Sequence, residues 1–329
     1  MIASLITNNI VDEHVDSEHV LKESKTATLF QTPEYLSGWS LFFLPDKNEI
    51  LKIIVTENEK PIGIGIFRRQ NNRLTFLGTD QIGDNHDLVT DFGDIVAVLG
   101  KEQTVWQEII KEAKAHGIQE MVLDYVREFS PSFEVLKALG FVVSEMIDHG
   151  QPDPAPFIDL PKIFDEYLLK LKRKERHEFK RKLRRLESET YQIVVSQNPN
   201  LDIDEFIRLH KASTGDKDRF MTKKMEGFFK QIVRVLSPKG LIDLLFMQID
   251  GKNVSSIISF VWQNEYWLYN SGFDRDYTNL AVGFLLKALS VKYAIAKGYK
   301  RYNFLRGNER YKYDLGAKDE RLYKMKINF

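Results

Sequence analysis

A group of chemically active side chains follows a strand-like run in the last part of the sequence. The stretch YNFLRGNERYKYDLG, residues 302–316, breaks at Gly307 and contains Arg306, Glu309, Tyr311 and Lys312. A carboxylate can accept a proton, a phenol can donate one, and arginine or lysine can hold an oxyanion. These residues therefore form either a solvated turn or one edge of an active site.

A second acidic candidate, Asp274, follows the aromatic run YWLYNSGF and precedes the apolar segment NLAVGFLL. Because it lies between a predicted strand and a predicted helix, Asp274 would face a cleft. Alternatively, Asp274 is a turn residue beside Arg275 with a structural role only. The backbone amides of residues 280–284 would open that helix, where unpaired N–H groups and the helix dipole favour an anion. Gly283 in this segment serves either phosphate binding or close packing.

A run of positive charge occupies the middle of the chain. Residues 172–185 hold nine Lys or Arg against Glu175 and Glu178. Apolar residues at spacings of three and four predict one long helix through PKIFDEYLLKLKRKERHEFKRKLRRLESET, with Pro161 in its first turn. Its cationic face is a solvated surface, a contact for the phosphates of a small ligand, or a contact for RNA.

Acidic residues and a histidine gather in the first half of the chain, in IGDNHDLVTDF, as Asp84, His86, Asp87 and Asp91. Carboxylates and imidazole can ligate a metal ion, but no paired-histidine spacing on a helix supports a metal centre here. The acids can also orient an amine or the hydroxyl groups of a sugar. We therefore predict no metal site in this segment.

One order of elements occurs twice. In the second half, the turns Asp250-Gly251 and Asn264-Glu265 separate three strand-like runs, and a helix from about Ala281 to Lys297 and the strand KRYNFL follow. In the first half, LKIIVTE, IGIGIFR and RLTFLG form another meander, followed by a longer loop, a helix from about Gln103 to His116 and the strand IQEMVLDY. Each half therefore predicts a mainly antiparallel sheet flanked by helices.

Setting Gly117 against Gly298 aligns IQEMVLDYVRE with YKRYNFLRGNE and places Glu128 opposite Glu309. This recurrence indicates duplication of one unit, with chance recurrence of common meanders as the alternative. The fold class predicted is α/β (α+β), in two domains covering residues 1–155 and 156–329.

The composition is that of a soluble globular protein of 329 residues. Lysine plus arginine and aspartate plus glutamate both total 47, so no net field attracts nucleic acid or a membrane to the whole molecule. Cysteine is absent, which excludes disulfides and thiolate sites and suits a cytoplasmic location. No signal peptide is evident, and lysines interrupt the most apolar helix candidate, so neither export nor membrane insertion is predicted.

Helices, a three-stranded meander, a helix behind a short loop and a further strand resemble the GNAT N-acyltransferase unit, and the chain resembles two such units in tandem. A fuller resemblance, over roughly residues 30–329, is to the CelD-type (BioF2-like) acetyltransferase family, related to the Fem aminoacyl transferases. It rests on KRKERHEFKRKLRRLE, RLHKAS, YNSGFDRDYTNLAVGFLL and above all NFLRGNERYKYDLG. The segment NLAVG departs from the usual GNAT loop, because it has one glycine instead of paired glycines.

The resemblance implies an N-acyltransferase that uses acyl-CoA as a co-substrate and holds no tightly bound cofactor. The donor would lie between the fourth and fifth strands of the second unit, which separate. The implied donor-binding residues are Leu280, Ala281, Val282, Gly283, Phe284, Arg306 and Lys312. Transfer to an amine needs a base for the amine proton and a proton donor for the leaving thiolate. Glu309 and Asp274 are the candidate bases, and Tyr311 is the candidate donor.

The first unit would help to form the acceptor groove through Asp84, His86 and Asp87. Arg176 and Lys180, which match the family's helix pattern, and His210 in RLHKAS complete the expected substrate contacts. A histidine at a helix end can equally be a cap or a packed residue. The acceptor would be an amine of a sugar, a glycan precursor or a small metabolite, and no DNA partner is expected.

Two other functions fit the same sequence. A Fem-like enzyme would take an aminoacyl group from charged tRNA, with the basic helix as its RNA contact. A non-catalytic module would use the duplicated fold only to bind a sugar or peptide. Measurements of donor binding, acyl transfer and tRNA binding distinguish the acyltransferase, the Fem-like enzyme and the binding module.

Overall fold

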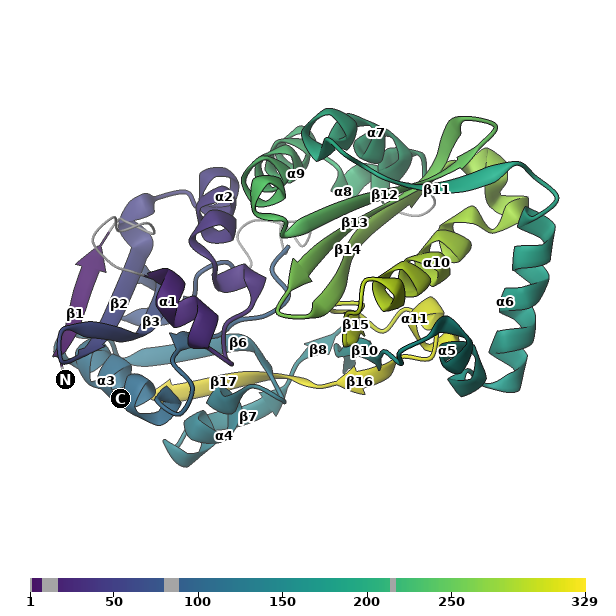
Figure 1. The fold of residues 1–329 in the computed structure, drawn as a ribbon. Helices are drawn as coiled ribbons and strands as arrows, with labels where there is room; N and C mark the ends of the chain where they lie inside the picture. Colours follow the sequence, from purple (N-terminus) through teal and green to yellow (C-terminus); the bar gives the residue numbers. More distant parts are fainter. Residues whose placement is uncertain (1, 8–16, 80–88, 214–216) are drawn as a thin grey trace. The chain divides into compact units, whose positions relative to one another are not determined.

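The computed structural model describes residues 2–7, 17–79, 89–213 and 217–329 (Figure 1). The chain forms two compact units, Met1–Pro154 with Glu320–Phe329, and Ala155–Asp319. The last ten residues therefore belong to unit 1, although the sequence analysis assigned them to the second domain. The reason is that the final strand completes the sheet of unit 1.

Unit 1 is built on a mixed sheet with strand order β1-β2-β3-β4-β6-β17-β7, and β5 pairs with β3. Its core lies between this sheet and helix α3, where Trp106, Ile109 and Leu123 are fully buried. The strands are β1 (Ile2–Thr7), β2 (Ile50–Glu57), β3 (Lys60–Gln70), β4 (Arg73–Phe76), β5 (Val96–Ala97), β6 (Glu120–Arg127), β7 (Val142–Glu145) and β17 (Leu322–Asn328), with the pair β8 (Ile147–Asp148) and β9 (Gln151–Pro152) apart. The helices are α1 (Ser17–Glu23), α2 (Pro33–Phe43), α3 (Glu102–Ala115) and α4 (Pro131–Ala138), with 3-10 turns η1 (Leu29–Gln31) and η2 (Lys47–Glu49).

Unit 2 is built on a second mixed sheet, with strand order β11-β12-β13-β14-β15-β10-β16. Helices α7 and α9 lie on one face of the sheet, and α10 with α6 lies on the other (Figure 1). The strands are β10 (Ala155–Asp159), β11 (Tyr191–Val195), β12 (Ile242–Ile249), β13 (Lys252–Trp262), β14 (Glu265–Phe273), β15 (Arg301–Asn303) and β16 (Lys318–Glu320). The helices are α5 (Phe164–Lys170), α6 (Arg173–Leu186), α7 (Pro199–Ala212), α8 (Lys217–Phe220), α9 (Lys223–Leu236), α10 (Val282–Ala296) and α11 (Arg310–Asp314), with 3-10 turns η3 (Ser237–Lys239) and η4 (Arg275–Leu280).

The basic helix is shorter than its apolar spacing predicts. The backbone becomes extended at Leu171 (φ −65°, ψ 143°) and separates α5 from α6. The Leu171 side chain is 5% exposed and packs against Gly316, where a Cβ would lie only 2.8 Å from Leu171 Cδ2. The packing of Leu171 therefore interrupts the helix, although the apolar spacing continues on both sides of this residue.

The two units repeat one local arrangement. Strand β4 pairs in parallel with β6, and β14 with β15, at equivalent positions. The pair Arg73–Glu120 in unit 1 corresponds to Glu265–Arg301 in unit 2, and each forms an ion pair of 3.5 Å with the charges exchanged. The alignment of Gly117 with Gly298 places Glu120 and Arg301, one member of each ion pair, at equivalent positions. The mixed, mainly antiparallel sheets flanked by helices are confirmed in both halves.

Each sheet also contains one strand inserted beside the parallel pair. Strand β17 lies between β6 and β7 in unit 1, and β10 lies between β15 and β16 in unit 2. In sequence, β10 follows the last strands of the first half, and β17 follows β16 directly. Within the described residues, no helix is long and apolar enough to span a bilayer.

Candidate active site

The parallel pair β14–β15 separates after a short contact. Its register runs only from Glu265–Arg301 to Trp267–Asn303. Beyond this point, the N–H of Phe304 donates to Pro156 O (2.8 Å), and the N–H of Leu305 donates to Asn303 Oδ1 (2.7 Å). The backbone after β15 therefore bonds to the β10 side and to itself, and within the described part of the chain β14 continues without a strand partner on that edge.

Side-chain oxygens occupy the open edge of β14. The N–H of Asp274 donates to Val254 O on β13, so the alternate N–H groups of Ser271 and Phe273 point away from β13. They donate to Asn270 Oδ1 (2.8 Å) and to Ser213 Oγ (2.7 Å). Side chains can rotate away from such positions, whereas a paired strand cannot. The edge is therefore able to exchange these bonds for bonds to an extended ligand.

Backbone strain lies on both sides of the separation. Leu305 follows β15 with φ 58°, and Ala281 precedes α10 with φ 55°. Residues with a Cβ rarely adopt this left-handed conformation, and such strain gathers at functional sites. The segment between β14 and α10 and the loop after β15 therefore each contain a residue that the surrounding structure holds in a strained backbone conformation.

The N-terminus of α10 follows β14 through η4, and no side chain of the described residues caps it. Its first-turn N–H groups carry the positive end of the helix dipole. Gly283 has a packing role here, because a Cβ at this position would lie 2.8 Å from Phe273 Cδ1. One turn further on, Lys287 Nζ donates to Gly283 O (3.2 Å) and lies 4.8 Å from the centre of the Tyr311 ring.

Two cations of α6 reach this helix end, and they are not the two chosen from the sequence. Lys182 Nζ lies 4.1 Å from the centre of the Phe284 ring, and Arg185 donates to Asn279 O (2.8 Å). Both residues flank the apolar stripe of α6 that contains Phe179 and Leu186. That position relative to the buried face was the sequence signal that could have identified them.

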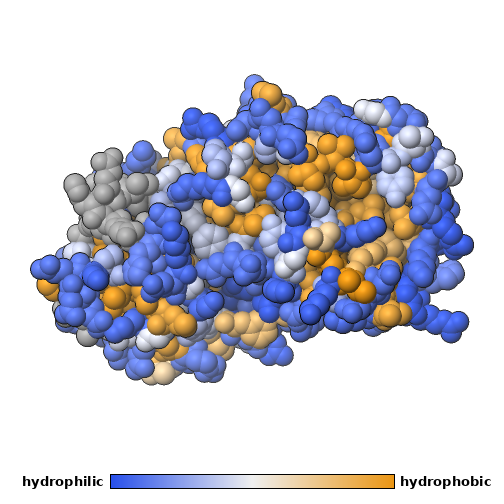
Figure 2. Space-filling view, viewed as in Figure 1, coloured by the Kyte–Doolittle hydropathy of each residue, from blue (hydrophilic) through white to orange (hydrophobic). Residues whose placement is uncertain are grey.

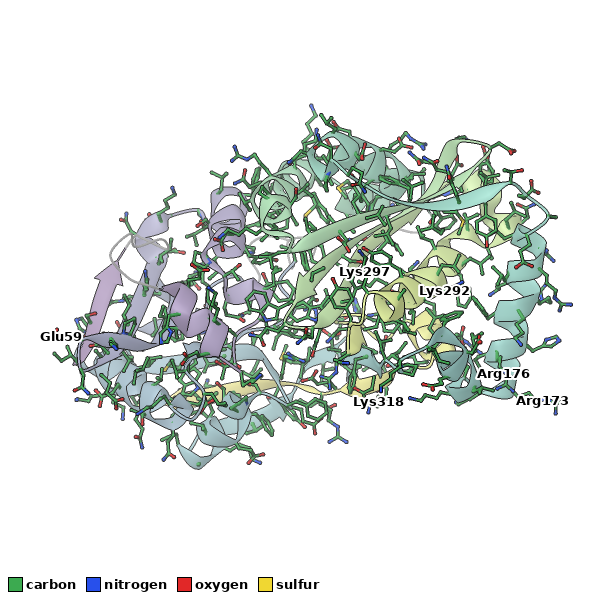
Figure 3. The ribbon with its side chains drawn as sticks, in the orientation of Figure 1. Glu59, Arg173, Arg176, Lys292, Lys297 and Lys318 are labelled. Atoms are coloured by element: carbon green, nitrogen blue, oxygen red, sulfur yellow. The ribbon has the colours of Figure 1, made fainter. Side chains whose placement is uncertain are left out.

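Arg176 and Lys180, the substrate contacts inferred from the resemblance, lie elsewhere on α6. Arg176 donates to Leu169 O (3.4 Å) at the junction of α5 and α6, and Lys180 is exposed. Figure 2 shows the outward side of α6 as hydrophilic, and Figure 3 shows Arg176 near the start of that helix. The structure therefore gives Arg176 a local structural contact and brings neither residue to the α10 N-terminus.

Lys312 organises the loop after β15. Its side chain is 1% exposed, and Nζ donates to Leu305 O (3.1 Å), Arg306 O (2.7 Å) and Gly307 O (3.0 Å). It also forms an ion pair of 2.8 Å with Glu309. The resemblance implies a contact of Lys312 with donor phosphates, but Nζ directs its three hydrogen bonds at carbonyl groups of the loop. Arg306 lies in the same loop and is half-buried.

Glu309 and Tyr311 form the chemically versatile part of the loop. The Glu309 side chain is 59% exposed and lies over Gly307, whose φ of 108° a residue with a Cβ rarely adopts. Burial raises the pKa of the Tyr311 phenol well above its usual value, and the negative charge of Glu309 adds to this rise. A phenol with a raised pKa keeps its proton, so Tyr311 can serve as a hydrogen-bond donor near the exposed Glu309 carboxylate.

Asp274 is a poor candidate for the base that the sequence suggested. Its Oδ2 accepts from Lys252 Nζ (2.9 Å), and its Oδ1 accepts from the N–H of Asp276 (3.1 Å). The hydrogen bond from Lys252 lowers the pKa of the Asp274 carboxyl. This residue caps η4 and stays ionised, as the turn interpretation predicts.

His210 does not line an open acceptor site. The side chain is 1% exposed, and its ring lies between Phe206 (5.8 Å) and Phe220 (5.6 Å). Its backbone sits against Gly272 of β14, where a Cβ would lie 2.3 Å from His210 N. His210 is a packed residue that brings α7 close to the sheet.

In unit 1, the gap that corresponds to the β14–β15 separation is filled by the chain itself. The N–H of Gly93 donates to Tyr125 O (3.1 Å) on β6. A Cβ on Gly93 would lie 2.5 Å from both Asp124 O and Phe76 Cδ2. The segment around Gly93 is therefore wedged between the ends of β4 and β6.

The expected acceptor contacts Asp84, His86 and Asp87 lie outside the described residues. Among the residues that the structure does describe, no group of three or more His, Cys, Asp or Glu could hold a metal ion.

Comparisons with known proteins add to this geometry. The family model of the acetyltransferase (GNAT) domain matches residues 173–313. No curated protein matches the sequence significantly. Among solved structures, FemX is similar over 100% of this chain and 98% of its own, with a TM-score of 0.67 and 15% identity.

Two further structures are similar over nearly the whole chain. L-PGS from Bacillus licheniformis has a TM-score of 0.59 and 12% identity, covering 94% of this chain and 90% of its own. A conserved protein of unknown function from Bacteroides thetaiotaomicron has a TM-score of 0.57 and 13% identity, covering 95% and 97%. At such identities the likeness shows the fold alone.

The match over residues 173–313 shows that the chain carries an acetyltransferase (GNAT) domain, as expected of an acyltransferase. The likeness to FemX and L-PGS over nearly the whole chain shows a similar fold. The predicted α/β fold class is confirmed, because each of the two units is a mixed sheet flanked by helices and the GNAT domain match lies within unit 2.

Proposed function

We propose that the chain is an N-acyltransferase that moves an acyl group, acetyl in the first instance, from acyl-CoA to an amine of a sugar, a glycan precursor or a small metabolite. The observation that carries this proposal is the separation of β14 from β15 beside the uncapped N-terminus of α10. The resemblance to the CelD-type (BioF2-like) family supports the same assignment within the superfamily.

The donor fits the chemistry of this separation. A pantetheine arm carries amide groups along an extended chain, and the open edge of β14 presents the N–H groups of Ser271 and Phe273 at alternate positions. The donor phosphates would lie at the first turn of α10, close to Lys182 and Arg185. Arg306 in the neighbouring loop is a further candidate for this contact.

We assign donor binding to unit 2 and acceptor recognition in part to unit 1. The self-filled gap at Gly93 supports this division, because the described residues of unit 1 offer no open edge equivalent to β14. One donor molecule is therefore expected per chain. The acceptor contacts proposed for unit 1 remain Asp84, His86 and Asp87.

In the proposed reaction the neutral amine attacks the thioester carbonyl, a C–N bond forms and the C–S bond breaks. Glu309 accepts the proton that the amine nitrogen loses, because it is the exposed carboxylate of the loop beside the separation. The Tyr311 phenol donates a hydrogen bond to the departing sulfur, which finally takes a proton as free thiol. Asp274 and His210 have no part in this scheme.

Glu309→Gln tests the scheme. With acetyl-CoA and a panel of amino sugars and small amines, we expect turnover to fall by at least about 100-fold, with an unchanged melting temperature and donor affinity. Glu205→Gln, which removes a carboxylate of α7 paired with Arg208, is the matched control and should retain activity. Wild-type turnover in Glu309→Gln would remove Glu309 from the mechanism.

A Fem-like transfer of an aminoacyl group from charged tRNA is the second candidate, because the fold is similar to that of FemX over the whole chain. A tight, salt-sensitive complex with charged tRNA and no response to acetyl-CoA would favour it. Acetyl-CoA at a hundred times its dissociation constant should stabilise the native state by about 2.7 kcal/mol. Stabilisation without transfer to any amine would instead favour a binding module.

A further inference from the structure

Positive charge is concentrated in one short part of unit 2. Residues 162–185 contain eleven Lys or Arg against four Asp or Glu, whereas the whole chain has 47 of each kind. The rest of the molecule is therefore net acidic. Such an asymmetry creates a local field for an anionic partner, even though the protein as a whole is neutral.

The outward side of α6 carries much of this charge. Phe179 and Leu186 are buried, and at 100° per residue Arg173, Lys180 and Arg184 lie on the opposite side of the helix. These three residues are exposed. Figure 2 shows this edge as hydrophilic, and Figure 3 shows Arg173 extending from the start of α6. Glu178 pairs with Arg181 and Lys182, not with these three.

Two large aliphatic side chains are exposed at the two ends of α5, the helix that precedes α6. Leu169 near the C-terminal end of α5 is 72% exposed, and Ile163, the residue directly before α5, is 54% exposed. The hydrogen bond from Arg176 to Leu169 O joins the end of α5 to the first turns of α6. Asp165 and Glu166 lie in the first turn of α5, and across residues 162–174 they are outnumbered by Lys162, Lys170, Lys172, Arg173 and Lys174.

We propose that this surface, formed by Ile163, Leu169 and the outward cations of α6, docks the protein onto the anionic face of a lipid bilayer. Exposed aliphatic side chains next to lysine and arginine are typical of interfacial binding, because the apolar groups enter the acyl boundary and the cations remain at the headgroups. Single-stranded RNA would call for aromatic platforms, and the exposed apolar residues here are aliphatic. The inference does not depend on the proposed acyl transfer.

The test measures sedimentation of the full-length protein with vesicles of phosphatidylglycerol and phosphatidylcholine, and with vesicles of phosphatidylcholine alone. We expect binding only to the anionic vesicles, weakening as salt rises. The double change Arg173→Gln and Lys174→Gln should weaken binding by about 25-fold, since each cation near the surface contributes about fivefold. Ile163→Ser with Leu169→Ser should weaken it by at least about tenfold at equal charge.

Matched controls come from the same unit. Lys223→Gln with Lys224→Gln removes two adjacent exposed lysines of α9, and Leu201→Ser removes an aliphatic side chain of α7 that is 74% exposed. Both controls should bind vesicles as the wild type does. Circular dichroism and melting curves verify that each variant is folded.

Three results would overturn the proposal. The first is no binding of the wild type to anionic vesicles. The second is an equal effect of the α6 and α9 double variants, which would mean attraction by charge alone. The third is wild-type vesicle binding by the Ile163/Leu169 variant together with tighter, α6-dependent binding of RNA, which would make the surface an RNA site.

Discussion

Lys312→Met distinguishes two roles of this lysine. The sequence predicts a contact with donor phosphates, whereas the structure shows a clamp on the loop after β15. Methionine keeps the length of the side chain and removes the ammonium group. In the structure that group holds three carbonyls of the loop, those of Leu305, Arg306 and Gly307, and pairs with Glu309. The variant therefore releases the loop, whereas loss of a phosphate ligand would weaken donor binding instead.

The size of the effect follows from the burial of each carbonyl. Arg306 and Gly307 are half-buried, so water can replace the lost bonds, but Leu305 is 3% exposed and its carbonyl would be left unsatisfied. An unsatisfied buried group costs about 1–3 kcal/mol, and we expect the free energy of unfolding to fall by about 2 kcal/mol. Displacement of Glu309 by about 1 Å should lower turnover by about 100-fold.

Urea unfolding measures the free energy of unfolding, steady-state kinetics measures turnover, and calorimetric titration with acetyl-CoA measures donor affinity. In Lys312→Met we expect the dissociation constant of the donor to change by less than about threefold. Lys182→Met with Arg185→Met is the reciprocal control, and it should weaken donor binding by at least about tenfold for the lost charged hydrogen bonds. A stable Lys312→Met protein with donor affinity reduced tenfold or more would refute the role of Lys312 as a loop clamp.

Two further predictions concern unit 1. Burial raises the pKa of the Asp94 carboxyl to about 7, against the hydrogen bonds from Ser130 and Ser132. The unfolded carboxyl ionises near pH 4 and the folded one near pH 7, so the folded state binds the extra proton between these values. The contribution of Asp94 to stability is therefore greatest below about pH 4 and falls by on the order of 4 kcal/mol by about pH 7. Urea midpoints across this range should show the slope, and Asp94→Asn should flatten it; an equal slope in the variant would contradict the assignment. Deletion of residues 320–329 removes β17 from between β6 and β7 and the Glu320 carboxylate from Arg127, which it contacts at 2.8 and 3.0 Å. A buried ion pair that loses one partner costs about 3–5 kcal/mol, before the loss of the strand is counted. Unit 1 should therefore lose its hydrogen-exchange protection, while residues 155–319 keep theirs. Native protection of β6 in the truncated chain would contradict this prediction.

Local patterns were sufficient for the repeated core of the fold. Runs rich in apolar residues and the turn Asp250-Gly251 predict the β12–β13 hairpin, and the mostly apolar run before Gly298, interrupted only by Lys287 and Lys292, predicts α10. These elements are formed by residues close in sequence. The break between α5 and α6 was not predictable, because it depends on the packing of Leu171 against Gly316, 145 positions away.

The candidate site was predictable in location but not in the role of each residue. The motif NFLRGNERYKYDLG indicated the loop after β15, which lies beside the strand separation. It could not show that Lys312 is buried and bonded to the backbone, or that Lys252 holds Asp274. Lys182 and Arg185 reach the segment before and at the start of α10 because they flank the apolar stripe by which α6 packs there. The run of nine cations does not single them out unless that stripe is taken into account.

The place of β17 has a consequence for synthesis of the protein. Its partners in β6 are made early, and Lys326 pairs with Val122 across roughly 200 intervening residues. Until the last strand leaves the ribosome, β6 and β7 present open edges, and such edges favour pairing with other chains. Unit 2 is complete before that moment, so the half of the protein that is translated first is the half that matures last.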